Sequence, residues 1–267
     1  MIAAADIDRA AADLYAAERD RRQIGLLSLR HPGMTLDEAY AVQAALVARK
    51  IADGRRPVGW KIGLTSRAMQ QALGITTPDS GVLTDDMVFA QGATVPPGRF
   101  IQPRIEAEIA FVMKAPLAGP GCTVAQVLAA TDHVVPALEI LDTRILRSDP
   151  ATGRARTIVD TVADNAANAG IVLGAGRFAP DAVDLRWSGA ILLRNGEVEE
   201  TGLGAGVLND PALAVAWLAD RLARYGMAIA AGDIVLSGSF IRPVEARPGD
   251  RFEADFAAMG VVRIDFS

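Results

Sequence analysis

Cysteine and histidine are scarce in this 267-residue chain, which contains one cysteine, Cys122, and two histidines, His31 and His133. A single cysteine cannot form a disulfide within the chain, and such low cysteine usage is typical of a reducing compartment. A Cys/His zinc site needs about four such ligands, more than these residues offer. The composition therefore predicts a cytoplasmic protein with neither a disulfide nor a structural zinc.

Long apolar runs and an excess of positive charge are also missing. No apolar segment approaches the roughly 20 residues of a membrane-spanning helix, and charged residues interrupt the alanine-rich N-terminus, unlike a signal peptide. The formal net charge of −5 argues against nucleic acid as a partner. With 51% hydrophobic residues, the chain can bury a sizeable core. We therefore expect a soluble globular protein of one large domain or two small ones, with no membrane or nucleic-acid partner.

The hydrophobic pattern divides the chain near residue 90. Residues 1–90 are expected to form an N-terminal helical part, in which the second of two helices is marked by the capping-box spacing of Thr35 and Glu38. Residues 91–267 are expected to form a larger, mostly β catalytic part, because short apolar segments alternate there with Gly and Pro. The predicted fold class is α+β. The expected strands are 58–65, 88–96, 106–113, 134–141, 170–174 and 233–240.

Two local patterns predict particular elements. Asn195 and Gly196 separate two strand-like segments and predict a tight hairpin turn, since both residues tolerate positive φ. Segment 210–226 is typical of an amphipathic helix, with Asp210 as N-cap and Gly226 just past the end.

Two glutamates in segment 103–111 give the densest chemical signal. In a strand, Glu106 and Glu108 project from the same face, because side chains alternate with a period of two. A solvated outer face would explain them, but the apolar neighbours indicate a buried sheet, where like charges repel unless a cation lies between them. Glu139 interrupts another apolar strand pattern, where an unpaired buried acid is costly. Together the three carboxylates would make an all-oxygen site suited to Mg²⁺ or Mn²⁺.

Lys61 and Asp79 are candidates for proton transfer. Lys61 lies between Gly59 and Gly63, and its ordinary role would be that of a surface lysine. Near an anionic substrate or a metal it could instead transfer a proton, if desolvation lowers its pKa. Asp79 follows a proline and would ordinarily be a turn residue, but it could also act as the acid/base partner of Lys61.

Longer motifs carry a family resemblance along essentially the whole chain. They are VGWKIGLTSRAMQ, PDSGVLTDDM, PRIEAEIAFV, DHVVPALEILD, DTVADNAANAG and GAGVLNDPALAVAWLA. These segments resemble the hydratases of aromatic meta-cleavage pathways, a group that includes 4-oxalocrotonate decarboxylases and belongs to the fumarylacetoacetase superfamily. Two residues depart from the expected pattern: Trp60 stands in place of a histidine and Ser80 in place of an aromatic residue.

The resemblance implies a fumarylacetoacetase-like mixed β-roll beside the N-terminal helical part. It also implies Mg²⁺, with Mn²⁺ as a substitute, bound by Glu106, Glu108 and Glu139, and an acid/base pair formed by Lys61 and Asp79. The implied reaction adds water to 2-oxo-hept-4-ene-1,7-dioate, a 2-oxo-enoate dicarboxylate of homoprotocatechuate degradation. A homo-oligomer, and association with a decarboxylase of the same pathway, are implied as well.

Four other functions compete with this interpretation. A decarboxylase or a 2-keto-4-pentenoate hydratase could use the same metal site, because each needs a stabilised enolate. A hydrolase that cleaves carbon–carbon bonds would need a histidine to activate water, and His133 is the candidate. A non-catalytic partner subunit of a decarboxylase would have no need of the acids and Lys61.

A dicarboxylate substrate needs a cation at its far end, because a second carboxylate is costly to bury unpaired. Arg242 is the first candidate, since a guanidinium can bind a carboxylate in bidentate fashion and Pro243 would stiffen its turn. Arg104 is the second candidate, because it lies on the same strand face as Glu106. Each could equally be a surface ion pair.

Overall fold

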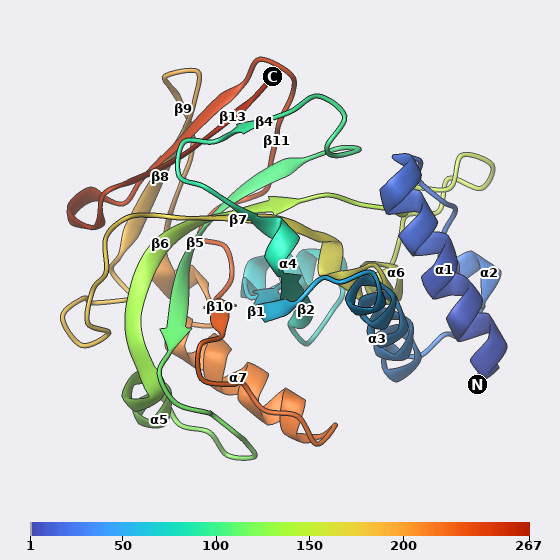
Figure 1. Cartoon of the computed structure of the whole chain (residues 1–267), viewed down its shortest axis with the longest axis horizontal. Helices are drawn as coiled ribbons and strands as arrows, with labels where there is room; N and C mark the ends of the chain where they lie inside the picture. Colours follow the sequence, from blue (N-terminus) through green and yellow to red (C-terminus); the bar gives the residue numbers. More distant parts are fainter. Residues whose placement is uncertain (1) are drawn as a thin grey trace.

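The computed structural model describes residues 2–267, apart from the side chains of Met69, Ala72 and Leu73. Its strands form two sheets, which curl toward one another beside a group of N-terminal helices (Figure 1). The predicted α+β class, with a mixed, curled sheet and a helical N-terminal part, is confirmed. No helix of the described residues is both long enough and apolar enough to cross a membrane.

The larger sheet carries the candidate catalytic residues. Its strand order is β2-β1-β10-β5-β6-β7-β3, and β11 also pairs with β5. The β1–β10 and β3–β7 pairs are parallel, and the remaining pairs are antiparallel. The strands are β1 (Pro57–Gly63), β2 (Asp79–Thr84), β3 (Val88–Phe89), β5 (Arg104–Met113), β6 (Thr131–Leu141), β7 (Asn168–Leu173), β10 (Ile234–Leu236) and β11 (Val244–Glu245).

The smaller sheet has the order β4-β13-β12-β8-β9. Its strands are β4 (Thr94–Val95), β8 (Gly189–Arg194), β9 (Glu197–Leu203), β12 (Arg251–Asp255) and β13 (Val261–Phe266). Asn195 and Gly196 join β8 to β9 with φ angles of 56° and 86°, which confirms the predicted hairpin turn. Apolar side chains from both sheets form one continuous core, which includes Phe111 of β5 and Phe252 of β12.

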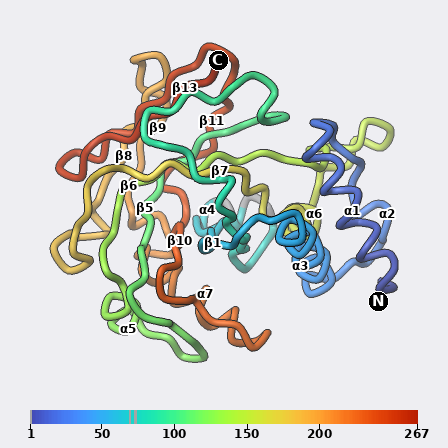
Figure 2. The backbone as a smooth tube through the Cα atoms, in the orientation of Figure 1, coloured from blue at the N-terminus to red at the C-terminus, as the bar shows by residue number. Residues whose placement is uncertain are grey.

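The helices pack in two groups. Beside the sheets lie α5 (Val124–Ala130) and α7 (Pro211–Ala223), whereas α1 (Ala4–Asp20), α2 (Leu27–Arg30), α3 (Leu36–Ala52) and α6 (Ile158–Ala163) share a second core. Figure 2 shows that α6 lies against α3 although the two are far apart in sequence. A further helix, α4 (Arg67–Leu73), connects β1 to β2, and short 3₁₀ turns are η1 (Asp85–Met87), η2 (Asn165–Ala167), η3 (Gly204–Gly206) and η4 (Ala257–Met259).

The predicted helix caps are present. Thr35 Oγ1 accepts a hydrogen bond from the Glu38 amide at 3.3 Å, and Glu38 Oε2 accepts one from the Thr35 amide at 2.8 Å. At the start of α7, Asp210 Oδ1 accepts a hydrogen bond from the Ala212 amide at 2.9 Å. These contacts satisfy amides that the first turn of each helix leaves without a partner.

Three segment predictions need correction. Residues 88–96 do not form one strand: Gly92, at φ 72°, lies in a turn that separates β3 and β4, which belong to different sheets. Residues 79–84 form a strand, so the ordinary turn reading of Asp79 is wrong. The strand predicted at 233–240 ends at Leu236. The division near residue 90 stays a prediction, and β1 and β2, which precede it, belong to the larger sheet.

A fully buried ion pair ties the end of β6 to the segment after α6. Arg144 is 1% exposed, and its Nε donates to Asp164 Oδ1 at 2.5 Å. Arg144 also donates through Nη2 to the Asp164 carbonyl oxygen at 2.5 Å and through Nη1 to the Asn168 carbonyl oxygen at 3.0 Å. The pair therefore fixes η2 and the start of β7 relative to β6.

Replacing Arg144 with Met should destabilise the protein by roughly 3–5 kcal/mol, because Asp164 would remain buried without its partner. Arg263→Ala is the matched control, since Arg263 pairs with Glu253 at the surface and such pairs contribute about 1 kcal/mol or less. Urea unfolding of both variants measures the difference. Similar losses in the two variants would contradict a central role for Arg144.

Candidate active site and metal centre

Three carboxylates meet at the centre of the larger sheet. Glu106 and Glu108 lie two residues apart on β5, so both side chains leave the same face. Strand pairing sets Glu106 directly opposite Glu139 of β6. Carboxylate oxygens of all three lie within 4.8 Å of one another. The structure thus brings together the three acids that the sequence pattern singled out.

This cluster is buried and short of hydrogen-bond donors. Glu108 and Glu139 have no exposed surface, and Glu106 is half-buried. Among the described residues, Glu108 Oε1 and both carboxylate oxygens of Glu139 lack a hydrogen-bond partner. Burial, together with the neighbouring carboxylates, raises the pKa of Glu106 to about 8 and holds the pKa of Glu108 well above its ordinary value. Burial likewise raises the pKa of Glu139.

Buried carboxylate oxygens that lack hydrogen-bond donors are suited to bind a hard divalent cation. Three carboxylates supply an all-oxygen donor set, which is the chemistry that Mg²⁺ and Mn²⁺ prefer. Buried polar atoms are normally satisfied, so carboxylate oxygens such as Glu108 Oε1 and Glu139 Oε2, which accept no hydrogen bond where three acids converge, are suited to coordinate a cation. The three glutamates can therefore hold a metal ion.

Lys61 supplies the positive charge next to the cluster. It lies on β1, is 3% exposed, and its Nζ is 3.3 Å from Glu139 Oε1. Burial alone would lower the pKa of Lys61, but the carboxylates of Glu139 and Asp79, with those of Glu106 and Glu108, raise it above its ordinary value. The metal-free site therefore keeps Lys61 as an ammonium, contrary to the expectation that desolvation lowers its pKa.

Asp79 approaches Lys61 because a glycine leaves room between them. Asp79 starts β2 opposite Gly63 of β1 and is fully buried. A Cβ on Gly63 would lie 2.3 Å from Asp79 Oδ1 and 3.1 Å from Lys61 Nζ. Burial raises the pKa of Asp79, and Lys61 partly offsets this. The structure thus brings the two predicted acid/base candidates together, and a residue larger than glycine at position 63 would clash with Asp79.

A backbone amide completes one side of the cluster. The Gly238 amide donates a hydrogen bond to Glu108 Oε2 at 2.8 Å. Gly238 has a φ of 119° and packs against Thr65, because a Cβ on Gly238 would lie 2.3 Å from Thr65 Oγ1. Sequence reasoning missed this contact because neither Ser237 nor Gly238 belongs to a catalytic motif. The available sequence signal was the apolar strand that ends at Leu236, since a glycine follows it two residues later.

The outer edge of β2, the end strand of the larger sheet, is held by the turn after α6. Asn165 Oδ1 accepts from the Val82 amide at 2.8 Å, and its Nδ2 donates to the Val82 carbonyl oxygen at 2.9 Å. Asn168 Nδ2 donates to the same carbonyl oxygen at 3.1 Å. Residues 165–167 all have positive φ, between 51° and 57°. The DNAAN segment therefore acts as a partner for the edge strand that carries Asp79.

A cavity of about 420 Å³ opens onto the carboxylates. Lys61, Asp79 and Glu106 line one part of it, whereas Arg104, Arg147 and Arg156 bring positive charge to its wall. Apolar side chains, including Leu64, Ile75, Leu141 and Ile158, make up much of the remainder. Sequence reasoning missed Arg147 and Arg156, which lie in a loop without periodic pattern.

The two arginine candidates differ in position. Arg104 lines the cavity. Arg242 is 76% exposed and its Nη2 bonds to Glu200 Oε1, whereas its neighbour Pro243 lines the cavity. In this arrangement the Arg242 guanidinium is engaged at the surface, so its substrate-binding role stays a prediction without geometric support.

The two departures from the family pattern point away from the acid cluster. Trp60 alternates with Lys61 on β1, and its Nε1 donates to Asp233 Oδ2 at 3.2 Å. Ser80 is buried beside Asp79, where its amide donates to the Tyr40 hydroxyl at 3.2 Å. Neither residue lines the cavity.

His133 does not fit a role in activating water at this cluster. It lies six residues before Glu139 on β6, about 20 Å away along an extended strand. Its Nδ1 is 2.7 Å from Asp132 Oδ2, an exposed neighbour. The arrangement therefore disfavours the hydrolase alternative that depended on His133.

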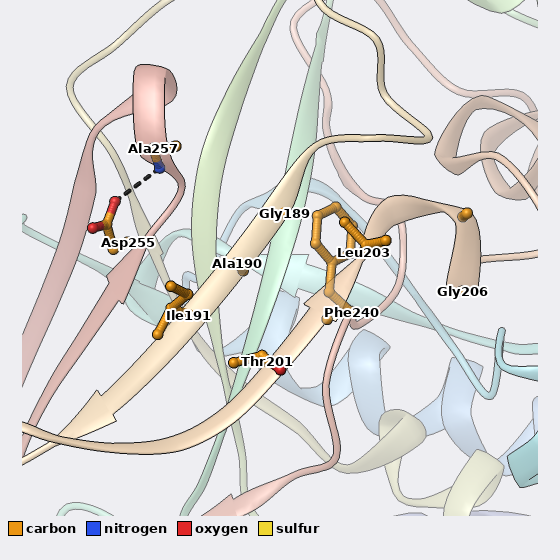
Figure 3. A pocket seen from close by; sticks show the side chains of 11 residues that line it. Gly189, Ala190, Ile191, Thr201, Leu203, Gly206, Phe240, Asp255 and Ala257 are labelled. Atoms are coloured by element: carbon orange, nitrogen blue, oxygen red, sulfur yellow. Dashed lines mark hydrogen bonds between the residues drawn. The ribbon is translucent and has the colours of Figure 1, made fainter.

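A larger depression, of about 900 Å³, lies at β8 and β9 (Figure 3). Its lining is mostly glycine and apolar side chains, among them Ile191, Leu203 and Phe240. The ionisable lining residue, Asp255, accepts a hydrogen bond from the Ala257 amide at 2.8 Å. Chemistry therefore favours the smaller cavity as the active site, despite its lesser volume.

Comparison with known proteins agrees with this geometry. Residues 59–266 match the family model described as fumarylacetoacetate (FAA) hydrolase C-terminal. The chain is 53% identical to 2-oxo-hept-4-ene-1,7-dioate hydratase of Escherichia coli, over 95% of each protein. It is 43% identical to 2-keto-4-pentenoate hydratase of Paraburkholderia xenovorans (strain LB400), over 97% of this chain and 94% of the relative.

A solved structure shares the whole fold. The 4-oxalocrotonate decarboxylase from Pseudomonas putida G7, complexed with magnesium and adipate, superposes with a TM-score of 0.94. The two are 36% identical, and the match covers 100% of this chain and 99% of the other. By sequence and by structure, the chain belongs to the fumarylacetoacetate hydrolase family, within its group of hydratases and 4-oxalocrotonate decarboxylases.

Proposed function

We propose that this protein is a Mg²⁺-dependent hydratase that converts 2-oxo-hept-4-ene-1,7-dioate to 4-hydroxy-2-oxoheptane-1,7-dioate. The observation that carries the proposal is the 53% identity to a hydratase of that substrate over 95% of both chains. The three converging carboxylates beside Lys61 and Asp79 support it, because hydration of an enoate needs charge stabilisation and proton transfer at one place.

Glu106, Glu108 and Glu139 would hold the cation, and Mn²⁺ would fit the same oxygen ligands. The magnesium reported with the decarboxylase relative supports this choice of metal. When bound, the cation would act as a Lewis acid that stabilises negative charge on the substrate's C2 oxygen. The amide of Gly238 holds Glu108 in place for that role.

We assign proton transfer to Lys61 and Asp79. The substrate reacts through its 2-hydroxydienoate tautomer, which loses the proton of its C2 hydroxyl and gains a proton at C5 to become a 2-oxo-3-enoate. Water then adds at C4, the position conjugated to the C2 carbonyl, and a proton is delivered to C3. Lys61, an ammonium in the metal-free site, can donate a proton from Nζ, and Asp79, whose pKa burial raises, can accept one.

Decarboxylation is the second candidate function. The TM-score of 0.94 to a 4-oxalocrotonate decarboxylase indicates that one backbone serves either reaction. Both reactions need a stabilised enolate, so the carboxylate cluster alone does not separate them. The greater identity to the hydratase, 53% against 41% for the 4-oxalocrotonate decarboxylase of Pseudomonas sp. (strain CF600), favours hydration.

We also propose that the protein works in the cytoplasm as a homo-oligomer and can associate with a decarboxylase that acts on a neighbouring metabolite. Apolar side chains exposed around β8 and β9, including Trp187 at 71%, support contact with another protein surface. The single cysteine supports a reducing compartment.

Purified protein given the dienol substrate and Mg²⁺ should form a product heavier by one water, as read by mass spectrometry. Treatment with a chelator should abolish turnover, and Mg²⁺ or Mn²⁺ should restore it. A product lighter by CO₂ would favour the decarboxylase, and turnover that survives complete metal removal would refute the metal-dependent mechanism. No turnover by the protein alone would favour a non-catalytic subunit.

Metal-free protein should lose stability as the pH rises from about 5 to about 9. Because the pKa of Glu106 is raised to about 8, its protonated form stabilises the fold at low pH, and this contribution disappears as the pH passes through about 8. Each linked proton accounts for at most about 1.4 kcal/mol per pH unit. Added Mg²⁺ should therefore stabilise the protein more at pH 9 than at pH 6.

Glu106→Gln is the control for this pH dependence, because it removes the titrating group and keeps the side-chain shape. Urea unfolding with a chelator present should show that the wild type loses more stability with rising pH than the variant does. Parallel pH curves for the two proteins would contradict a raised pKa at Glu106.

Gly63→Ala should lower kcat by about 100-fold, because the new methyl group would occupy the space where Asp79 approaches Lys61. Gly25→Ala is the matched control, since a Cβ there meets no atom within 4 Å. Steady-state kinetics, with thermal unfolding to verify the fold, compares the two. Equal activity in both variants would show that the spacing of Lys61 and Asp79 is not critical.

A further inference from the structure

The loop between β6 and α6 carries two arginines to the cavity wall. The loop folds back on itself: the Arg156 amide donates to the Arg147 carbonyl oxygen at 2.9 Å, and Ser148 and Ala155 form an antiparallel bridge. Arg147 and Arg156 therefore lie side by side at the base of a hairpin. Both line the cavity that also contains Glu106 and Lys61.

The charges of Arg104 and Arg156 reach Glu106 and Asp79, but the guanidinium groups of the cavity wall make few direct polar contacts. Within the part of the chain that the structure describes, the side chains of Arg104 and Arg147 make no hydrogen bond or ion pair, and Arg156 Nη1 donates to Thr143 Oγ1 at 2.6 Å. Burial, together with Arg104 and Arg156, lowers the pKa of Arg147 to about 10. Such a group of cations is destabilising unless an anion binds among them.

The nearby acids are committed to other partners. Asp142 accepts from the amides of Ile101 and Gln102, and Asp164 is paired with Arg144. Asp160 accepts from Ser28 and from the Thr157 amide, and Glu245 contacts Arg247. These four acids already have hydrogen-bond or ion-pair partners, so Arg147 and Arg156 can bind an external anion.

The cavity thus combines acidic and basic lining residues. Carboxylates and Lys61 offer a site for a metal ion and a 2-oxo acid head, and the arginines offer a site for a second anion. A cavity of about 420 Å³ is in the range of sites that enclose small ligands. A straight-chain diacid has an anion at each end and matches this arrangement, whereas a monoacid would leave the arginines unpaired.

We propose that Arg147 and Arg156, with Arg104 beside them, bind the distal carboxylate of the substrate and so set the preference for dicarboxylates. The proposal rests on the proposed hydratase function and names the residues that select its substrate. Arginine suits this role because its planar guanidinium binds a carboxylate through two parallel hydrogen bonds. The site differs from the one expected at Arg242, whose side chain bonds to Glu200.

Arg147→Ala should raise KM for the seven-carbon diacid by about 30-fold or more, while KM and kcat for the five-carbon monoacid, 2-hydroxypenta-2,4-dienoate, stay within about twofold. Arg147→Lys should recover part of the loss, since it restores the charge without the bidentate geometry. Arg154→Ala is the matched control, because Arg154 belongs to the same hairpin but is exposed and does not line the cavity.

Calorimetry with unreactive analogues tests the same site without turnover. In the presence of Mg²⁺, wild-type protein should bind 2-oxoheptanedioate more tightly than 2-oxopentanoate, and Arg147→Ala should lose that preference. Failure of the wild type to hydrate either substrate, with this preference intact, would overturn the proposed function but support the anion site. Equal losses on diacid and monoacid, no loss on either, or a selective loss in Arg242→Ala would overturn the assignment of Arg147.

Discussion

The mutual repulsion of three buried carboxylates is the constraint on which the site depends. Glu106, Glu108 and Glu139 converge within a sheet whose surroundings are apolar, and burying such charges costs several kcal/mol each unless they are paired. Lys61 offsets part of the repulsion by contact with Glu139. The raised pKa values mean that protons relieve the rest of the repulsion, so a metal ion that bound here would compete with protons for the same oxygens.

Close contacts between the backbone and the acidic side chains hold this unfavourable cluster together, and two of these contacts require glycine. Gly63 gives Asp79 its place beside Lys61, and Gly238 brings an amide to Glu108. Asn165 pairs with both polar groups of Val82, so the edge strand β2 is fixed although one side of it lacks a neighbouring strand. The Arg144–Asp164 pair in turn fixes the turn that contains Asn165. Each of these contacts depends on a residue to which we assign a positioning role and no proton transfer or metal binding.

The acid cluster could be predicted from the sequence because its signal is local. A period of two puts Glu106 and Glu108 on one face, and a lone acid in an apolar run singles out Glu139. The register that sets Glu106 opposite Glu139 is a tertiary property, as is the strand conformation of Asp79. Arg147 and Arg156 lie in an irregular loop, where no periodicity indicates which side chains face a cavity. Arg242 illustrates the same limit, because Glu200, its partner, is 42 residues away in sequence.

The distribution of charge along the cavity also explains how relatives with different reactions share one backbone. On the proposed binding mode, a 2-oxo diacid held at both ends would present the same carbons to Lys61 and Asp79 whether it gains water or loses CO₂. The charged groups would then set which molecules bind, and the acid cluster would stabilise an enolate in either case. On this proposal the choice of reaction would depend on the uncharged residues of the wall, among them Leu64, Ile75, Leu141 and Thr161. Hydration requires that a water molecule reach C4, so we expect the polarity of these wall residues, rather than the charged groups, to decide the product.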